Sequence, residues 1–295
     1  MKKLSVLFLM VCVLVSCTND GSSTNDNQDA QMTGYEIRSK SVFQDPDVPT
    51  IERVTVANFQ NGKPFSEAVE NFQNGISDGS PVTTQTHFYN GDLLISKAEE
   101  NSNRITDFYY DSGNNIIGAK MTLYNTGVNH YRFIPVSQNV VYFERISLPY
   151  DDSSATIYFR IIVEFDAHDN VIRAGRDNNQ DGVAEFETQF SYVDDNLVSI
   201  SRNGGTVENF AYSNVIDNFS ALYDSMYGKR NGRILDSEMY VSGGPEHRSK
   251  NIASDDLSDN VYEVMDTNYY KKRTVVKNYT DPVGQNTTTT EFFFD

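Results

Sequence analysis

The chain of 295 residues contains no tryptophan, two cysteines and four histidines. Both cysteines, Cys12 and Cys17, lie near the amino terminus, so no disulfide can join segments of the remaining chain. Also missing are a phosphate loop, a dinucleotide-binding fingerprint and a Gly-x-Ser-x-Gly motif. The histidines form no His-x-x-x-His pair of the kind that binds zinc: they are His87, His130, His168 and His247. The sequence therefore favours a non-catalytic protein, and we assign no catalytic residue.

Positive charge is scarce. Asp and Glu together number 41 against 24 Lys and Arg, which gives a formal net charge of −17 at pH 7. Such a charge repels nucleic acid and anionic lipid headgroups, so nucleic acid is not an expected partner. An acidic surface also attracts divalent cations, although a merely solvated surface would have the same composition.

Long apolar runs are absent except at the amino terminus. Lys2 and Lys3 precede the run Leu4 to Val15, which is shorter than the ~20 apolar residues that a transmembrane helix needs. A basic start, a short apolar core and a small residue before the cleavage point are typical of a secretory signal. We therefore predict a signal peptide over residues 1–16.

The end of this segment, Leu14-Val15-Ser16-Cys17, resembles the lipobox of bacterial lipoproteins. The resemblance implies cleavage before Cys17, lipid attachment to its thiol and acylation of the new amino terminus. Several acyl chains hold a protein stably on a bilayer, whereas a single chain binds only marginally. Position 18 is Thr instead of Asp, which by the same resemblance favours the outer membrane, on either its periplasmic or its surface leaflet. The alternative is an ordinary signal peptide with an incidental cysteine.

Residues 17–34 are polar, acidic and nearly free of apolar side chains. Such a segment cannot bury enough apolar surface to form a packed element. It is predicted to be a flexible tether. Residues 35–295 then form a single antiparallel β domain.

The domain is predicted to be all-β, because apolar and polar residues alternate through many short segments separated by Asn, Asp and Gly. The clearest stretch runs from Thr156 to Tyr212. We expect a large antiparallel up-and-down meander that forms a curved or partly closed sheet, ending on a paired strand. One short helix is expected near residues 216–227, with irregular structure over 63–81, a helical turn at 67–72, and a second irregular segment at 249–259.

Four units of the chain share one pattern, in which an aromatic strand end, an Asp/Asn/Gly turn and an apolar strand start follow each other. They begin at Phe88, Tyr109, Glu164 and Ser191. These units resemble the YD (Rhs-type) hairpin repeats, and the chain resembles uncharacterised Gram-negative cell-surface lipoproteins that carry them. The resemblance implies a long meander curled into a broad, partly closed, porin-like sheet. An unrelated antiparallel meander would contain similar turns.

One loop has the spacing of a calcium site. Oxygen-bearing side chains occupy its positions one, three, five and nine, and Gly182 occupies position six. The predicted ligands of a structural calcium ion are Asp177, Asn179, Asp181, the carbonyl of Val183, and Glu185. Position twelve, where an EF-hand has a bidentate Glu, is Thr188. The alternative is a plain hairpin with solvated polar side chains.

The favoured function is that of a lipid-anchored cell-envelope lipoprotein with a binding or scaffolding role. Its expected partners are the membrane, through the anchor, and a glycan or an envelope protein. Two alternatives remain open: a glycan-capture lipoprotein beside an outer-membrane transporter, and a hydrolase of extracellular glycan. A glycosidase needs two carboxylates across a cleft, whereas adjacent acids in turns are more often turn formers. The adjacent pairs are Asp151/Asp152, Asp194/Asp195 and Asp255/Asp256.

Overall fold

A computed structural model describes residues 33–43, 47–123, 127–242, 249–254, 258–264, 270–281 and 284–294. The predicted signal peptide, the lipid-attachment residue Cys17 and the tether up to residue 32 lie outside the described residues, and so does the pair Asp255/Asp256. These assignments stay predictions.

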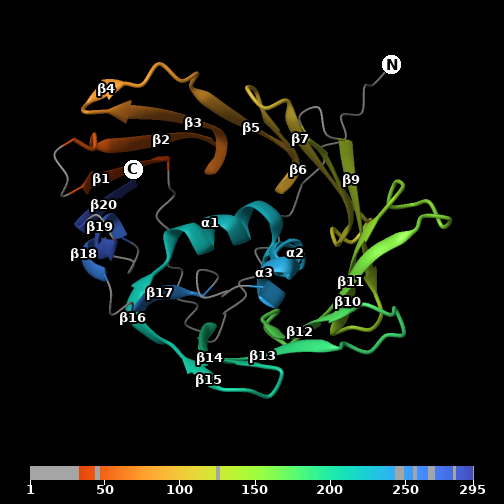
Figure 1. The fold of residues 1–295 in the computed structure, drawn as a ribbon. Helices are drawn as coiled ribbons and strands as arrows, with labels where there is room; N and C mark the ends of the chain where they lie inside the picture. Colours follow the sequence, from red (N-terminus) through yellow and green to blue (C-terminus); the bar gives the residue numbers. More distant parts are fainter. Residues whose placement is uncertain are drawn as a thin grey trace, which may run out of the picture.

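Strands account for most of the described chain (Figure 1). Their bounds are β1 Gly34–Phe43, β2 Ile51–Gln60, β3 Lys63–Gln73, β4 Ile76–Ser77, β5 Thr83–Asn90, β6 Leu93–Glu99, β7 Arg104–Tyr110, β8 Ile116–Leu123, β9 Gly127–Pro135, β10 Val140–Ile146, β11 Ile157–Phe165, β12 Val171–Asp177, β13 Phe186–Val193, β14 Asn196–Arg202, β15 Val207–Asn209, β16 Ala211–Ile216, β17 Asn251–Ser254, β18 Ser258–Val264, β19 Tyr270–Asp281 and β20 Gly284–Phe294.

Eighteen of these strands form one antiparallel sheet in which most sequence neighbours are also spatial neighbours. The path runs from β18 through β19 and β20 to β1, and then from β2 in chain order to β15. The separate pair β16–β17 lies between β15 and β18 in Figure 1. The sheet curves into an incompletely closed ring. The predicted all-β class and partly closed antiparallel meander are confirmed.

The first and last described strands pair with each other. β1 and β20 are antiparallel, with Tyr35 opposite Phe294 and Phe43 opposite Asn286. β20 also pairs with β19 along its length. The prediction that the chain ends on a paired strand is confirmed, and the two ends of the domain lie side by side within the sheet.

The four similar sequence units are all hairpin turns, of two kinds. In the units that begin at Tyr109 and Glu164, an Asp Oδ1 accepts hydrogen bonds from the backbone N–H groups two and four residues later, at 2.8 and 2.9 Å. The units that begin at Phe88 and Ser191 turn over two residues instead. In three of the units Asn or Asp residues adopt positive φ, which their short polar side chains tolerate, and in the Phe88 unit Gly91 adopts it instead.

Three short helices follow β16: α1 Asn218–Tyr227, α2 Lys229–Leu235 and α3 Ser237–Ser242. Asp217 caps α1 by accepting a hydrogen bond from Phe219 N–H at 3.0 Å, and Gly228 ends it with φ of 79°. The single predicted helix matches α1, but the expectation of only one helix was wrong. Within the described residues, no helix has the length and hydropathy needed to cross a membrane.

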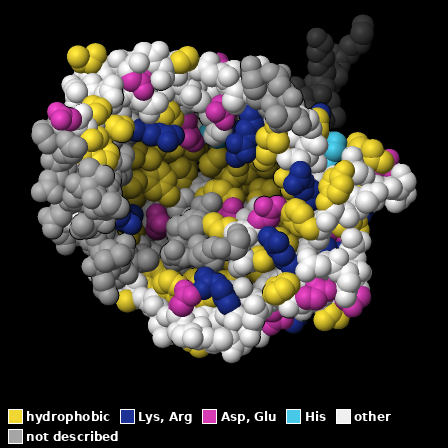
Figure 2. Space-filling view, viewed as in Figure 1, with side chains coloured by type: hydrophobic (Ala, Val, Ile, Leu, Met, Phe, Trp, Pro, Cys, Tyr) yellow, Lys and Arg dark blue, Asp and Glu magenta, His cyan; other side chains and the backbone are white. Residues whose placement is uncertain are grey.

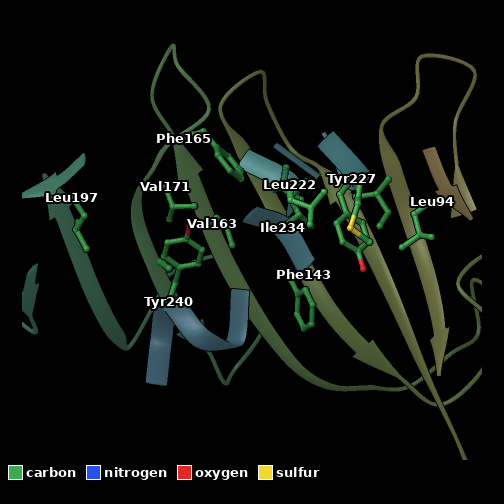
Figure 3. Close-up of a cluster of buried hydrophobic side chains, with 14 of the residues drawn as sticks. Leu94, Phe143, Val163, Phe165, Val171, Leu197, Leu222, Tyr227, Ile234 and Tyr240 are labelled. Carbon is green, nitrogen blue, oxygen red and sulfur yellow. The ribbon is translucent and has the colours of Figure 1, made fainter. Parts of the chain in front are cut away.

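The helices lie inside the curve of the sheet and bury their apolar side chains against its inner face (Figure 1). α1 contacts β3 and β6, and α3 contacts β11, β12 and β13. In Figure 3, Leu222, Tyr227 and Ile234 from the helices lie near sheet residues such as Phe143 and Val163. Burying each such side chain contributes about 1.5–3 kcal/mol, so this interface is the main core of the domain.

The start of α1 holds the two terminal strands together. The Phe219 ring packs edge-on against Tyr35 of β1 at 5.3 Å and against Phe294 of β20 at 5.1 Å between centroids. Neighbouring Asn218 is buried and donates from Nδ2 to the carbonyl of Tyr270 in β19 at 2.8 Å. Three strands from opposite ends of the chain are therefore joined through one helical turn.

Helix α2 closes one end of the ring by binding its turns. The Asn231 side chain accepts from Ile116 N–H at 3.0 Å and donates to the carbonyl of Asn114 at 2.9 Å, which secures the β7–β8 turn. Ile116 N–H is buried, so this side chain supplies an acceptor that water cannot.

The two residues before Asn231 reach the next turns along the rim. Arg230 donates to the carbonyl of Gln138 at 2.7 Å and pairs with Asp169 at 2.9 Å, in the β9–β10 and β11–β12 turns. Lys229 pairs with Asp195 of the β13–β14 turn at 3.0 Å. The first turn of α2 thus contacts four successive hairpins.

Two segments predicted to be irregular are largely strands, although residues 78–81 are irregular as predicted. Residues 63–73 form β3, which pairs with β2 and β5, so the helical turn expected at 67–72 was also wrong. Residues 251–254 form β17, and β18 begins at Ser258. β3 pairs on both sides, β17 pairs with β16 and β18 pairs with β19, and this pairing supplies backbone hydrogen bonds that override weak local propensity.

Candidate functional site

The predicted metal loop connects β12 to β13. Asp177 is the last residue of β12, and Asn179, Asp181, Val183 and Glu185 follow in the connection. Carboxylate oxygens of Asp177, Asp181 and Glu185 lie within 4.8 Å of one another, as a shared metal ion requires. This is the one group of three or more His, Cys, Asp or Glu side chains at such spacing within the described ranges.

Backbone N–H groups already organise these carboxylates. Asp177 accepts from the amides of Asp181 at 3.1 Å and Gly182 at 3.0 Å, and Glu185 accepts from the Asn178 amide at 2.8 Å. Gly182 adopts φ of 87°, a conformation that favours glycine and lets the loop wrap around Asp177. The loop therefore orients its acids by itself.

Asp177 also ends a row of alternating charges across four strands. Register places Arg132, Glu144, Arg160 and Asp177 side by side on β9 to β12. Arg132 and Arg160 each reach Glu144 at 2.7 Å, and Arg160 reaches Asp177 at 3.2 Å. Glu144 and Asp177 are fully buried. Since the next residue, Ile161, belongs to the core, this row lies on the opposite, outer face.

The loop retains capacity for a cation. Three carboxylates beside one guanidinium leave an excess of negative charge. A carboxylate oxygen has two lone pairs, and among the described residues Asp177 Oδ1 and Asp181 Oδ1 each accept one hydrogen bond. Asn179 Oδ1 accepts from the Asp181 amide at 3.2 Å and lies in the same loop. The donor set is all oxygen, which suits calcium more than zinc.

Inside the ring is a feature that the sequence did not indicate, a cavity of about 440 Å³ between the helices and the wall formed by β6 to β10. We call it the inner cavity. Figure 2 shows a hollow lined mostly by hydrophobic side chains, with charged side chains around it. Its lining includes Lys97, Phe108, Ala119, Met121, Phe133, Phe143, Asp236 and Glu238.

A smaller cavity of about 210 Å³ adjoins the inner cavity and shares Lys97, Tyr223 and Tyr227 with it. Its wall contains Glu67 and His87. His87 is 3% exposed, and in the part of the chain that the structure describes its Nδ1 has no hydrogen-bond partner. Burial lowers the pKa of His87 to about 4, raises the pKa of Glu67 and lowers the pKa of Lys97. Burial thus disfavours the charged form of all three groups.

The adjacent acidic pairs of the sequence are turn formers where they are described. Asp152 Oδ1 accepts from Ser154 N–H at 2.8 Å. Asp194 and Asp195 both have positive φ and form the β13–β14 turn. They line a polar depression of about 600 Å³ together with His168. A second pair of carboxylates, Asp236 and Glu238, lines the inner cavity, and no sequence motif marked it.

Comparison of the sequence with protein-family models and with curated proteins finds no match. Among solved structures, the chain is similar to a porin-like protein from Bacteroides uniformis ATCC 8492, with a TM-score of 0.43 and 9% sequence identity. The likeness covers 90% of this chain and 97% of that chain. A similarity this distant assigns no activity, ligand or membrane anchor, so the resemblance to repeat-bearing lipoproteins stays a prediction.

Proposed function

We propose that the protein is a lipid-anchored, non-catalytic binding protein of the cell envelope, which holds a small ligand in the inner cavity. The observation that carries the proposal is that cavity. Its volume of about 440 Å³ and its largely apolar lining with a few ionisable groups are typical of small-molecule sites. The signal-like start and the lipobox resemblance at Cys17 support the envelope location.

Binding of the neutral dye Nile red, followed by its fluorescence, tests the cavity. Ala119 is buried in the cavity wall on β8, so Ala119→Phe fills part of the space and should weaken dye binding at least about tenfold. Ala98→Phe is the matched control, because Ala98 follows Lys97 and so faces the other side of the sheet. Equal binding by both variants and the wild type would contradict the proposal.

Calcium is proposed as a structural ion of the 177–185 loop, where it would neutralise carboxylates that otherwise repel one another. Calorimetry with millimolar calcium should detect binding, and Asp181→Ala should abolish it. Asp151→Ala, which removes an acid from an exposed turn elsewhere, is the control and should leave binding unchanged. Absence of heat in the wild type would refute the site.

A glycan hydrolase is the second candidate, and the observation that favours it is the pair Asp236 and Glu238 in one concave site. Tyr223 donates a hydrogen bond to Asp236 Oδ1 at 3.1 Å. Reducing-sugar release from a panel of polysaccharides, lost in Glu238→Gln, is the expected sign of hydrolysis. No release by the wild type would leave binding as the proposed function.

A further inference from the structure

The inner cavity has charges of opposite sign on its two sides. Lys97 of β6 lies on the sheet side, and Asp236 and Glu238 lie on the helical side, at the end of α2 and the start of α3. Among the described residues, no acceptor lies within hydrogen-bond or ion-pair distance of the Lys97 ammonium, although Glu67 in the adjoining smaller cavity, and then Asp236, attract it from farther away. The cavity therefore carries charges of both signs, and within the described part of the chain the Lys97 ammonium makes no hydrogen bond or ion pair.

The floor between these charges is apolar and mainly aromatic. Phe108, Phe133 and Phe143 line it and are at most 7% exposed. Phe143 lies 5.4 Å from Phe133 between ring centroids, so the two rings form one continuous surface. An aromatic or branched aliphatic group placed here would gain the transfer free energy of leaving water.

The surroundings of Lys97 favour an anionic ligand group. Burial lowers the pKa of Lys97, and nearby Arg104 lowers it further. Arg104 lies two residues before Thr106, the register partner of Lys97 on β7, and so follows the same inner face. An anionic group on Lys97 would gain from both cations and would restore hydrogen bonds that desolvation removed.

A simple anion or a simple cation fits this cavity poorly. A lone carboxylate on Lys97 would sit near Asp236 and Glu238, and a lone ammonium near those acids would sit near Lys97. A molecule that carries both charges and an apolar group meets each side with the complementary sign, and a free α-amino acid is the simplest molecule of this kind.

We propose that the inner cavity binds a free α-amino acid with a large apolar side chain. Its carboxylate lies on Lys97, its ammonium faces Asp236 and Glu238, and its side chain lies on the aromatic floor. This assignment rests on the proposed function, because it names the ligand class of the same cavity.

Calorimetry with three related ligands tests the assignment on the purified protein. L-phenylalanine has both charges, phenylalaninamide lacks the carboxylate, and N-acetylphenylalanine lacks the ammonium. We expect both analogues to bind at least about tenfold more weakly than phenylalanine, because each loses a charge-assisted contact. Alanine, which lacks the apolar group, should bind weakest.

Variants assign each charge to its side. Lys97→Gln should abolish the preference for phenylalanine over its amide, and Glu238→Gln should reduce the preference over N-acetylphenylalanine. Lys120→Gln is the control: Lys120 lies on β8 between the cavity residues Ala119 and Met121, so it faces away and should change neither preference. Circular dichroism of each variant verifies folding.

Two outcomes would overturn the assignment. If the three phenylalanine ligands bind equally, Lys97, Asp236 and Glu238 do not recognise the charges of the ligand. If none binds while Nile red still enters the cavity, the ligand class is wrong and the proposed binding function stands. Failure of Nile red as well would remove the binding function itself.

Discussion

His87 shows how a single buried group ties stability to pH. Burial depresses its pKa in the folded state to about 4, whereas the free side chain titrates near 6.5. The unfolded chain therefore binds this proton first, and the contribution of neutral His87 to stability is lost as pH falls from 6.5 to 4. Burial raises the pKa of neighbouring Glu67, so the contribution of Glu67 to stability depends on pH in the opposite direction and is lost as pH rises.

We predict that His87→Phe flattens this pH dependence. Relative to wild type, the variant should gain about 3 kcal/mol of unfolding free energy as the pH falls from 7 to 4, because it has no imidazole to protonate. Urea unfolding across this pH range provides the measurement. Parallel curves for the two proteins would mean that His87 is not held neutral in the folded state.

Gly118 lies where a larger side chain would overlap the ring of Tyr150. A Cβ at this position would lie 2.5 Å from Cγ of Tyr150, whose ring stacks on Tyr109 at 4.7 Å between centroids. Gly118→Ala should destabilise the protein by about 1–3 kcal/mol through this overlap. In the Tyr150→Ala background the same substitution should cost much less, as a thermal-melt double-mutant cycle would show. An additive cycle would contradict the overlap.

At the scale of elements, the contacts of α2 with the hairpin turns predict unequal effects along one helical turn. Asn231→Ala leaves the buried Ile116 N–H without its acceptor and should cost about 1–3 kcal/mol. Lys229→Ala removes a partly exposed ion pair and should cost at most about 1 kcal/mol. Chemical denaturation of both variants measures the loss of unfolding free energy, and equal losses in the two variants would contradict this ranking.

The same scale shows which elements a sequence can reveal. Strands such as β11 and β13 were predicted because their apolar residues alternate between Asn- and Asp-rich turns. β3 was missed because its pattern includes Glu67 and Glu70 near partly buried positions, and its pairing with β2 and β5 is decided by those neighbours. α2 was missed because it is short and contains Gly232, and its contacts are with distant turns.

The candidate sites divide in the same way. The 177–185 loop is local in sequence, so its spacing alone predicted that Asp177, Asp181 and Glu185 would meet. The inner cavity joins side chains from β6, β8 and β10 to helical residues at least 80 positions away in the chain. No period or motif encodes such a meeting, and Lys97 carries no local signal that distinguishes it from a surface lysine.

For the whole molecule, the position of β20 predicts how truncation acts. β20 is an interior strand between β19 and β1, and it buries Phe294 beside Tyr35. Removal of residues 284–295 should therefore abolish cooperative unfolding, because it exposes two strand edges and opens the aromatic cluster. Circular dichroism melting gives the readout, and a truncated protein that still melts in one sharp transition would refute this expectation.

The meeting of β1 and β20 also sets an order of events for a newly made chain. One edge of β1 pairs with β20, which leaves the ribosome about 250 residues later, so this pairing cannot form until synthesis is nearly complete. Because the two strands are so far apart in the chain, their pairing is entropically costly and slow. A polypeptide that passes through a narrow translocation channel would benefit from this delay, because β1 cannot pair fully before the carboxyl-terminal strand β20 is available.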